Sequence, residues 1–316
     1  MAKFGVSLPT IGMGDPQAIR LVAQQVEAAG LDSVWAADHI VLPTGDTSPY
    51  PYAEGGEFLI PPGMPFMDQF TSLAYVAGIT ERIMLGTAVT LLPLRHPLSV
   101  AKTVATLDVL SGGRAILGVA AGWLEEEFRA LGLDFKARGR MLDEGLDVLR
   151  AIWTQPNASH HGEFYDFQDV AAYPQPSQKP HPPIWVGGHT QPVMRRAARV
   201  GDMWLPPLFH ATPADLAARY ASVQTMAEGH GRKPSDVGLA LRVLVDLREE
   251  PDPTGPQKRG ALLGPAQQVA ETLASYQEIG VSHFVLLPQA RSLDDVQRTI
   301  DIIAKDVVPA LRDNAR

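Results

Sequence analysis

Short apolar runs alternate with amphipathic segments along the whole chain. The apolar runs predict buried strands at residues 4–8, 33–36, 83–91, 115–119, 183–187, 203–205, 238–245 and 283–287. The segments between them predict helices, and the first helix begins after Asp15-Pro16. Its apolar stripe has the i, i+3, i+4, i+7 spacing and consists of Ile19, Val22, Ala23 and Val26. The stripe of the last helix consists of Val296, Ile300, Ile303 and Val307.

Eight strand–helix units in succession predict a TIM (β/α)8 barrel, an α/β fold whose active site is built at the carboxyl ends of its strands. A doubly wound open sheet is the alternative architecture. It is disfavoured because Gly12 and Gly14 do not give the G-x-G-x-x-G spacing after the first strand. The 316 residues fit one barrel of this kind, so we expect a single domain over residues 1–316.

Two connections, after the second and fourth strands, are longer than simple loops. Residues 42–67 are rich in proline and carry Tyr50, Tyr52 and Phe58, which is typical of a lid over a pocket. Residues 155–181 contain HHGEFYDF, which indicates a short hairpin, and then a proline-rich segment. A disordered linker remains the alternative for both, because proline and glycine occur in lids and in slack chain alike.

The composition, 45% hydrophobic and 20% charged, is that of an ordinary globular protein. A net charge of -8 with scattered basic residues argues against a nucleic-acid partner. Arg195, Arg196 and Arg199 form the densest basic group, for which we expect a solvated helix face, with a phosphate contact as the alternative. The lack of cysteine excludes thiolate catalysis and cysteine-bound metals. Without a secretion signal or a long apolar run, the sequence predicts a cytoplasmic protein with no membrane partner.

A histidine follows the second strand directly. His39 should therefore project at the catalytic face, and imidazole is the side chain best suited to proton transfer near neutral pH. A purely structural histidine is the alternative. The preceding Asp38 is expected to orient His39 or to cap a helix rather than to act as an acid.

Small residues gather at three other strand ends and predict room for a flat ring system. They are Thr87, Ala88, Val89, Ala120, Ala121, Gly122, Gly187 and Gly188. The glycine pair runs into a helix whose first amides can receive an anion. Close packing is the alternative for residues 120–122 and for the glycine pair.

No metal site is predicted. His160 and His161 are adjacent and point apart, while Glu125, Glu126 and Glu127 form an acidic helix start that we expect to be solvated. The sequence also has no nucleophile elbow and no P-loop, so hydrolase and kinase functions lack a motif.

The chain resembles the luciferase-like monooxygenase superfamily, and most of all its coenzyme F420-dependent oxidoreductase branch. The resemblance lies in SVWAADHIVLP, IMLGTAVTLLPLRHPLSVAKTVATLDVLSGGRAILGVAAGWLEEEF, RGRMLDEGLDVLRAIW and HPPIWVGGH, in this order. It implies a TIM barrel that binds a deazaflavin or flavin, with a homodimer as the expected assembly.

The same resemblance implies residue roles. It places His39 at the reactive edge of the deazaflavin as proton donor or acceptor, and a non-prolyl cis peptide at Ala88-Val89 behind the ring. The implied cofactor-binding set is Asp38, Thr87, Ala88, Val89, Ala120, Ala121, Gly122, Gly187, Gly188 and His189. Within it, the last three residues give backbone contacts to the cofactor phosphate.

One departure bears on the substrate. Trp123 stands where the sugar-phosphate dehydrogenases of this branch have a glutamate, and no lysine and arginine set is evident for a sugar phosphate. We therefore expect a small hydrophobic or aromatic substrate. The expected pocket walls are Tyr50, Phe58, Trp123, Trp204 and Phe209.

Three functions follow from the resemblance. The first is an F420-dependent oxidoreductase that transfers hydride. The alternative is an FMNH2-dependent two-component monooxygenase, which inserts oxygen into an aldehyde, ketone or alkane and needs a partner flavin reductase. The second alternative is a non-catalytic barrel that binds a cofactor or ligand.

Overall fold

The computed structural model describes residues 2–52, 55–58, 60–61, 63–208, 211–250, 261–290 and 292–313. Within them, eight parallel strands close into a ring in which each strand pairs with the next and the last pairs with the first. These strands are β1 (Lys3–Ser7), β2 (Ser33–Ala36), β3 (Met84–Thr87), β5 (Ala115–Ala120), β8 (Ile184–Gly187), β9 (Met203–Leu205), β10 (Gly238–Leu247) and β12 (Val281–Pro288). The predicted TIM barrel is confirmed.

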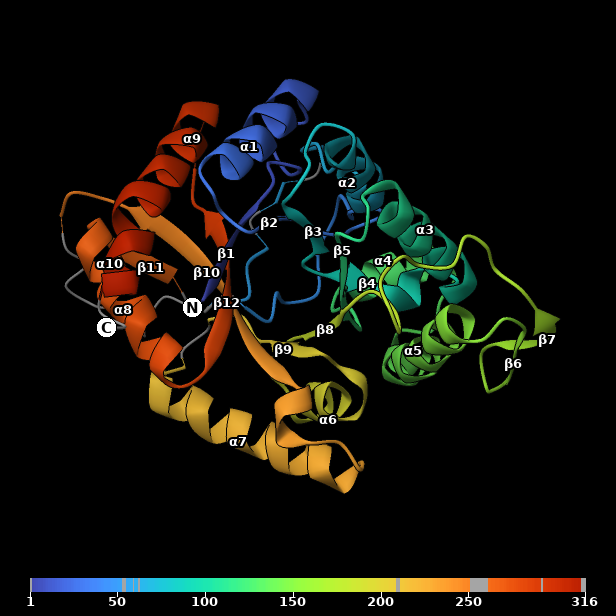
Figure 1. Ribbon diagram of the computed structural model, residues 1–316. Coiled ribbons are helices and arrows are strands. Elements are labelled where there is room, and N and C mark those ends of the chain that lie inside the picture. The colour runs from blue at the N-terminus through green and yellow to red at the C-terminus, as the bar shows by residue number, and fades with distance from the viewer. Residues whose placement is uncertain are drawn as a thin grey trace.

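Helices surround the strands (Figure 1). They are α1 (Pro16–Ala28), α2 (Gln69–Ala77), α3 (Pro97–Leu110), α4 (Glu125–Ala130), α5 (Arg138–Thr154), α6 (Gln191–Val200), α7 (Pro213–Gly229), α8 (Ala266–Glu278), α9 (Leu293–Ile302) and α10 (Val308–Asp313). Asp15 caps α1 as predicted, and both predicted apolar stripes are buried. No helix in the described part of the chain is long and apolar enough to cross a membrane.

The third predicted strand is interrupted. β3 ends at Thr87, and the chain resumes as the two-residue β4 (Thr90–Leu91), which pairs with β5. Between them lies the predicted non-prolyl cis peptide, Ala88-Val89. Strand β11 (Ala261–Gly264), which pairs with β10 outside the ring, was not among the eight predicted strands.

The two long connections differ in structure. The described residues of 42–67 form no helix or strand, and a bridge from Phe66 to Ile11 ties this segment to the loop after β1. The second connection contains the predicted hairpin, formed by β6 (Ala158–His161) and β7 (Asp166–Val170). Figure 1 shows this hairpin at the periphery, beyond α5.

The floor of the barrel interior is filled by large side chains. Trp35 and Trp185 meet with their ring centroids 4.7 Å apart, and the buried His283 lies at the edge of both rings. A Cβ atom at Gly86 would lie 2.2 Å from the Trp35 ring, so only glycine leaves room for it there. Since these side chains fill the interior, the cavity described below lies toward the carboxyl ends of the strands.

Candidate active site

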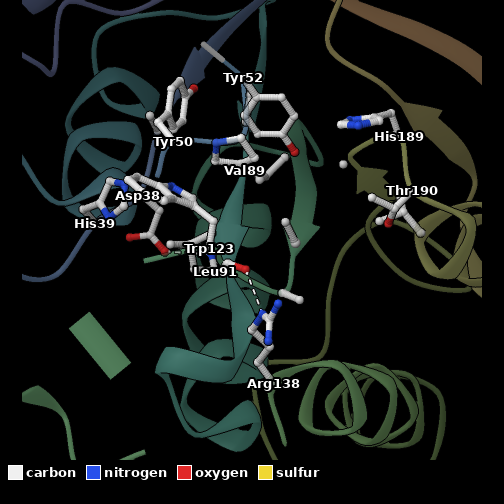
Figure 2. Close-up of a pocket in the computed structure, with 18 of the residues that line it drawn as sticks. Asp38, His39, Tyr50, Tyr52, Val89, Leu91, Trp123, Arg138, His189 and Thr190 are labelled. Carbon is white, nitrogen blue, oxygen red and sulfur yellow. Dashed lines mark hydrogen bonds between the residues drawn. The ribbon is translucent and has the colours of Figure 1, made fainter. Parts of the chain in front are cut away.

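A cavity of about 610 Å³ opens at the carboxyl ends of the strands. Figure 2 shows 18 of the residues that line it, with His39 on one side and His189 and Thr190 on the other. It brings together predicted site residues from five parts of the chain. They are Asp38, His39, Tyr50, Phe58, Ala88, Val89, Ala120, Ala121, Gly122, Trp123, Gly187 and His189.

Three predicted site residues do not line this cavity, and Phe209 lies outside the described residues. Thr87 is buried, and its hydroxyl donates to the Gly118 carbonyl at 2.8 Å. Trp204 is fully buried, and its Nε1 donates to the Gly188 carbonyl at 2.8 Å. Gly188 adopts a φ of +120°, and its amide donates to Leu205.

The expectation that Trp204 walls the substrate pocket is therefore wrong. Side chains alternate along a strand, and Met203 and Leu205 pack with the barrel interior, so Trp204 between them faces the helices. A three-residue strand gives no alternation from which the buried face can be read. The sequence predicts that Thr87 lies at a strand end. It does not predict the two hydrogen bonds between Thr87 and Gly118, which depend on the register between β3 and β5.

His39 contacts a buried glutamate. Its Nδ1 lies 2.7 Å from Oε2 of Glu127, whose side chain has no exposed surface. The other oxygen of Glu127 accepts the amides of Ile40 at 2.6 Å and Val41 at 3.2 Å. The expectation that Glu127 is solvated is wrong, because α4 turns this side chain inward.

A signal for this arrangement was present in the sequence. Leu124 and Phe128 are both fully buried, and Glu127 shares their helix face at the i, i+3, i+4 spacing. The charge of three successive glutamates predicts exposure to solvent, whereas this periodicity predicts burial of Glu127.

Asp38 does not orient His39, in contrast to the prediction. Its carboxylate accepts both terminal nitrogens of Arg95, at 2.5 and 2.8 Å, and the amide of Leu91 at 2.9 Å. Burial raises the pKa of the Asp38 carboxyl, while the Arg95 guanidinium acts to lower it. Asp38 therefore joins the end of β2 to the turn after β4, and both of its carboxylate oxygens accept hydrogen bonds from that turn.

Aromatic rings surround His39. Tyr50, Phe58 and Trp123 contact one another with ring centroids 4.9 to 5.5 Å apart. The His39 ring packs edge-on against Phe58 and Trp123 and also against Phe66, which the sequence analysis missed, with centroid distances of 5.4 to 6.1 Å. The histidine thus faces an apolar part of the cavity.

The cavity also has basic side chains, among which Lys136, Arg138 and Arg242 were not predicted and Arg196 belongs to the basic group of the sequence analysis. Arg138 donates to the carbonyls of Gly122 and Phe135. Arg196 is not solvated as expected, since it pairs with Asp143 of α5 at 2.7 Å.

The Arg242 side chain has a buried donor that the described residues do not satisfy. Its Nε is buried and has no hydrogen-bond partner among the described residues. It lies two positions after Ala240, a barrel-interior residue, so strand alternation directs it inward. Nearby, burial lowers the pKa of His189 and raises that of Tyr52, which favours the neutral form of each.

Comparison with known proteins places the chain among related sequences. A family model described as luciferase-like monooxygenase matches residues 1–254. An uncharacterized protein of Mycobacterium tuberculosis is 35% identical over 211 residues, 67% of this chain and 72% of the relative. An FMNH2-dependent dimethylsulfone monooxygenase of Pseudomonas putida is 42% identical over 111 residues, 34% of this chain and 31% of the relative.

A solved structure extends the comparison to the fold. An F420-dependent secondary alcohol dehydrogenase in complex with an F420-acetone adduct superposes with a TM-score of 0.79. The match covers 98% of this chain and 99% of that chain at 19% sequence identity. At this identity the likeness shows the shared barrel fold.

Proposed function

The chain belongs to the luciferase-like monooxygenase family, and we propose that it is an F420-dependent oxidoreductase that transfers hydride between the deazaflavin and a small, hydrophobic organic substrate. One observation carries the proposal. His39 lies in the same cavity as the small residues Ala120, Ala121 and Gly122, at the carboxyl ends of the barrel strands. This combination offers a flat groove beside a group that can exchange a proton.

The residues present fit a deazaflavin or flavin. Both cofactors carry a phosphate group, and the cavity offers Lys136, Arg138 and Arg196 as cations. The buried Nε of Arg242, with no partner in the described part of the chain, is a donor that a ligand oxygen would satisfy. Gly187, His189 and Thr190 would hold the phosphate end where α6 begins.

Each part of the site would have a distinct task. The bound deazaflavin supplies or accepts a hydride, which is a two-electron transfer. His39 gives a proton to the atom next to the one that receives hydride, or takes it in the reverse direction, so that two hydrogens are added or removed in total. Tyr50, Phe58 and Trp123 would exclude water and contact the apolar part of the substrate. Residues 42–67, which carry two of these rings, would act as the lid.

A second function has support from one relative. The Pseudomonas putida protein with 42% identity over 111 residues is named as an FMNH2-dependent monooxygenase. In that case a partner flavin reductase would supply reduced FMN as the two-electron donor, so that the substrate would gain one atom of O2 and the other would leave as water. We also propose a homodimer in the cytoplasm for either function.

Cofactor preference tests the proposal. Purified protein is titrated with oxidised F420 and with FMN while tryptophan fluorescence is followed, since Trp123 lines the cavity. We expect tighter binding of F420, followed by turnover with no oxygen consumption. Tighter binding of FMN together with oxygen uptake would replace the first function by the second. Binding without any turnover across ketones, alcohols, enones and imines would favour a non-catalytic barrel.

A further inference from the structure

The contact between α4 and the end of β2 fixes the His39 ring. We propose that Glu127 is a positioning residue that keeps the proton of neutral His39 on Nδ1, so that Nε2 is the atom that exchanges a proton with the substrate. This inference deepens the proposed function and rests on it. It concerns a residue that the sequence pattern assigned to solvent.

The two oxygens of Glu127 have separate partners. Oε1 accepts the backbone amides of Ile40 and Val41, which can only donate. Oε2 lies 2.7 Å from Nδ1 of His39. An ionised carboxylate only accepts hydrogen bonds, so Nδ1 must carry the hydrogen in this contact. The lone pair of neutral His39 is then on Nε2, on the ring edge away from Glu127.

Three hydrogen-bond donors and the position on the helix favour a carboxylate at this place. The Glu127 side chain has 0% exposure, and it shares its helix face with the buried residues Leu124 and Phe128. It is the third residue of α4, where the helix dipole and unpaired amides favour a negative charge. The other buried carboxylate near His39, that of Asp38, is taken up by Arg95 and Leu91.

The wild-type protein tests the tautomer directly. Long-range ¹H–¹⁵N NMR correlations distinguish Nδ1–H from Nε2–H histidine, and the His39 signals are identified by their loss in His39→Asn. We expect the Nδ1–H pattern for neutral His39 in the protein without added cofactor. An Nε2–H pattern would overturn the inference. The tautomer is read from the wild-type protein, and His39→Asn, or His39→Gln if that variant does not fold, serves only to identify the signals.

Glu127→Gln tests the consequence for the reaction. The amide has the same size, and if its oxygen keeps the amides of Ile40 and Val41, its NH2 group faces Nδ1. Nδ1 must then accept, which moves the proton to Nε2. We expect kcat to fall by about 10² to 10⁴, with KM and the cofactor Kd within about threefold; the same kind of change in a serine-protease triad costs about 10⁴.

Glu125→Gln is the matched control, because Glu125 lies on the same helix, is half exposed and pairs with Arg129. It should change neither the NMR pattern nor kcat. A folded Glu127→Gln protein with wild-type kcat would overturn the positioning role while leaving the proposed function intact. Failure to bind F420 and FMN, with the Nδ1–H pattern present, would instead overturn the proposed function and leave the tautomer assignment standing.

Discussion

Two glutamate–histidine contacts in this protein share their local chemistry and differ in their surroundings. Glu127 accepts His39 and two backbone amides. Glu144 of α5 accepts Nε2 of His160 at 3.2 Å and the amides of Glu163, Phe164 and Tyr165. In each case a carboxylate on a helix gathers donors from a neighbouring segment and fixes its path.

The difference lies beyond the shared contact. His39 lines the cavity among aromatic rings, whereas His160 belongs to the peripheral hairpin β6–β7 and stacks on Phe167. A histidine held by a carboxylate is therefore not in itself a reactive site. A cavity beside the second ring nitrogen is also required, and only the fold provides it.

The largest expected effect separates the two histidines. His39→Ala should lower the rate of hydride transfer by about 10² to 10⁴, because general acid–base catalysis contributes roughly that factor. The Kd of this variant for the cofactor should stay within a few fold of the wild-type value. His160→Ala should leave the rate unchanged. Stopped-flow absorbance with F420 and fluorescence titration provide the two measurements, and equal losses in both variants would contradict the comparison.

A third histidine, His283, sharpens the comparison. Its Nε2 lies 2.8 Å from a hydroxyl oxygen, the Oγ of Ser33, and not from a carboxylate. Burial lowers the pKa of His283 to about 3. Below about pH 6.5 the unfolded chain takes up a proton that the folded protein does not. The free energy of unfolding therefore decreases as the pH is lowered from about 6.5 to about 3.

The effect amounts to about 1.4 kcal/mol per pH unit, or roughly 2 kcal/mol between pH 6.5 and pH 5. Urea unfolding of the wild-type protein at both pH values should show this change. In His283→Gln the unfolding free energy should depend less steeply on pH, by an amount that corresponds to about one proton taken up on unfolding. Equal slopes in the two proteins would argue against a neutral, buried His283.

The hairpin contact should affect stability instead of activity. Glu144→Gln removes a charge that accepts three backbone amides, so we expect a loss of about 1 to 3 kcal/mol in unfolding free energy with kcat unchanged. Urea unfolding and steady-state kinetics measure the two quantities. A tenfold fall in kcat without loss of stability would mean that the hairpin takes part in turnover.

The smallest effect is expected at the exposed end of the same hairpin. Arg140 and Glu163 form a salt bridge at 2.9 Å in which both side chains are more than half exposed. Such pairs contribute little, since water and salt screen them. Arg140→Gln should leave the urea midpoint and kcat within experimental error. A clear destabilisation would show that the hairpin depends on this pair as well as on Glu144.

Much of the architecture was predictable because it depends on local periodicity. The stripe of α1 and the runs at β2 and β5 have lengths and spacings that only a buried helix face or strand satisfies. Strand ends could also be placed, which located His39 and the small residues after β5. The hairpin β6–β7 followed from its local turn pattern in the same way.

The partners of the site residues were not predictable from sequence. Glu127 lies 88 residues from His39, and Arg95 lies 57 residues from Asp38. Each side chain is ordinary by its local pattern, and only the closed barrel decides which carboxylate meets which donor. The same holds for Arg242, which lines the cavity because β10 presents it inward.

The sequence by itself determined the barrel, the strand ends and the presence of a histidine where chemistry is expected. Only the tertiary structure decided that Glu127 holds His39, that Asp38 is taken by Arg95 and that Trp204 packs away from the cavity. The physical reason is range. Periodicity and turn formation are set by residues a few positions apart, whereas hydrogen bonds at the site join segments that meet only after the eight strands close into a ring.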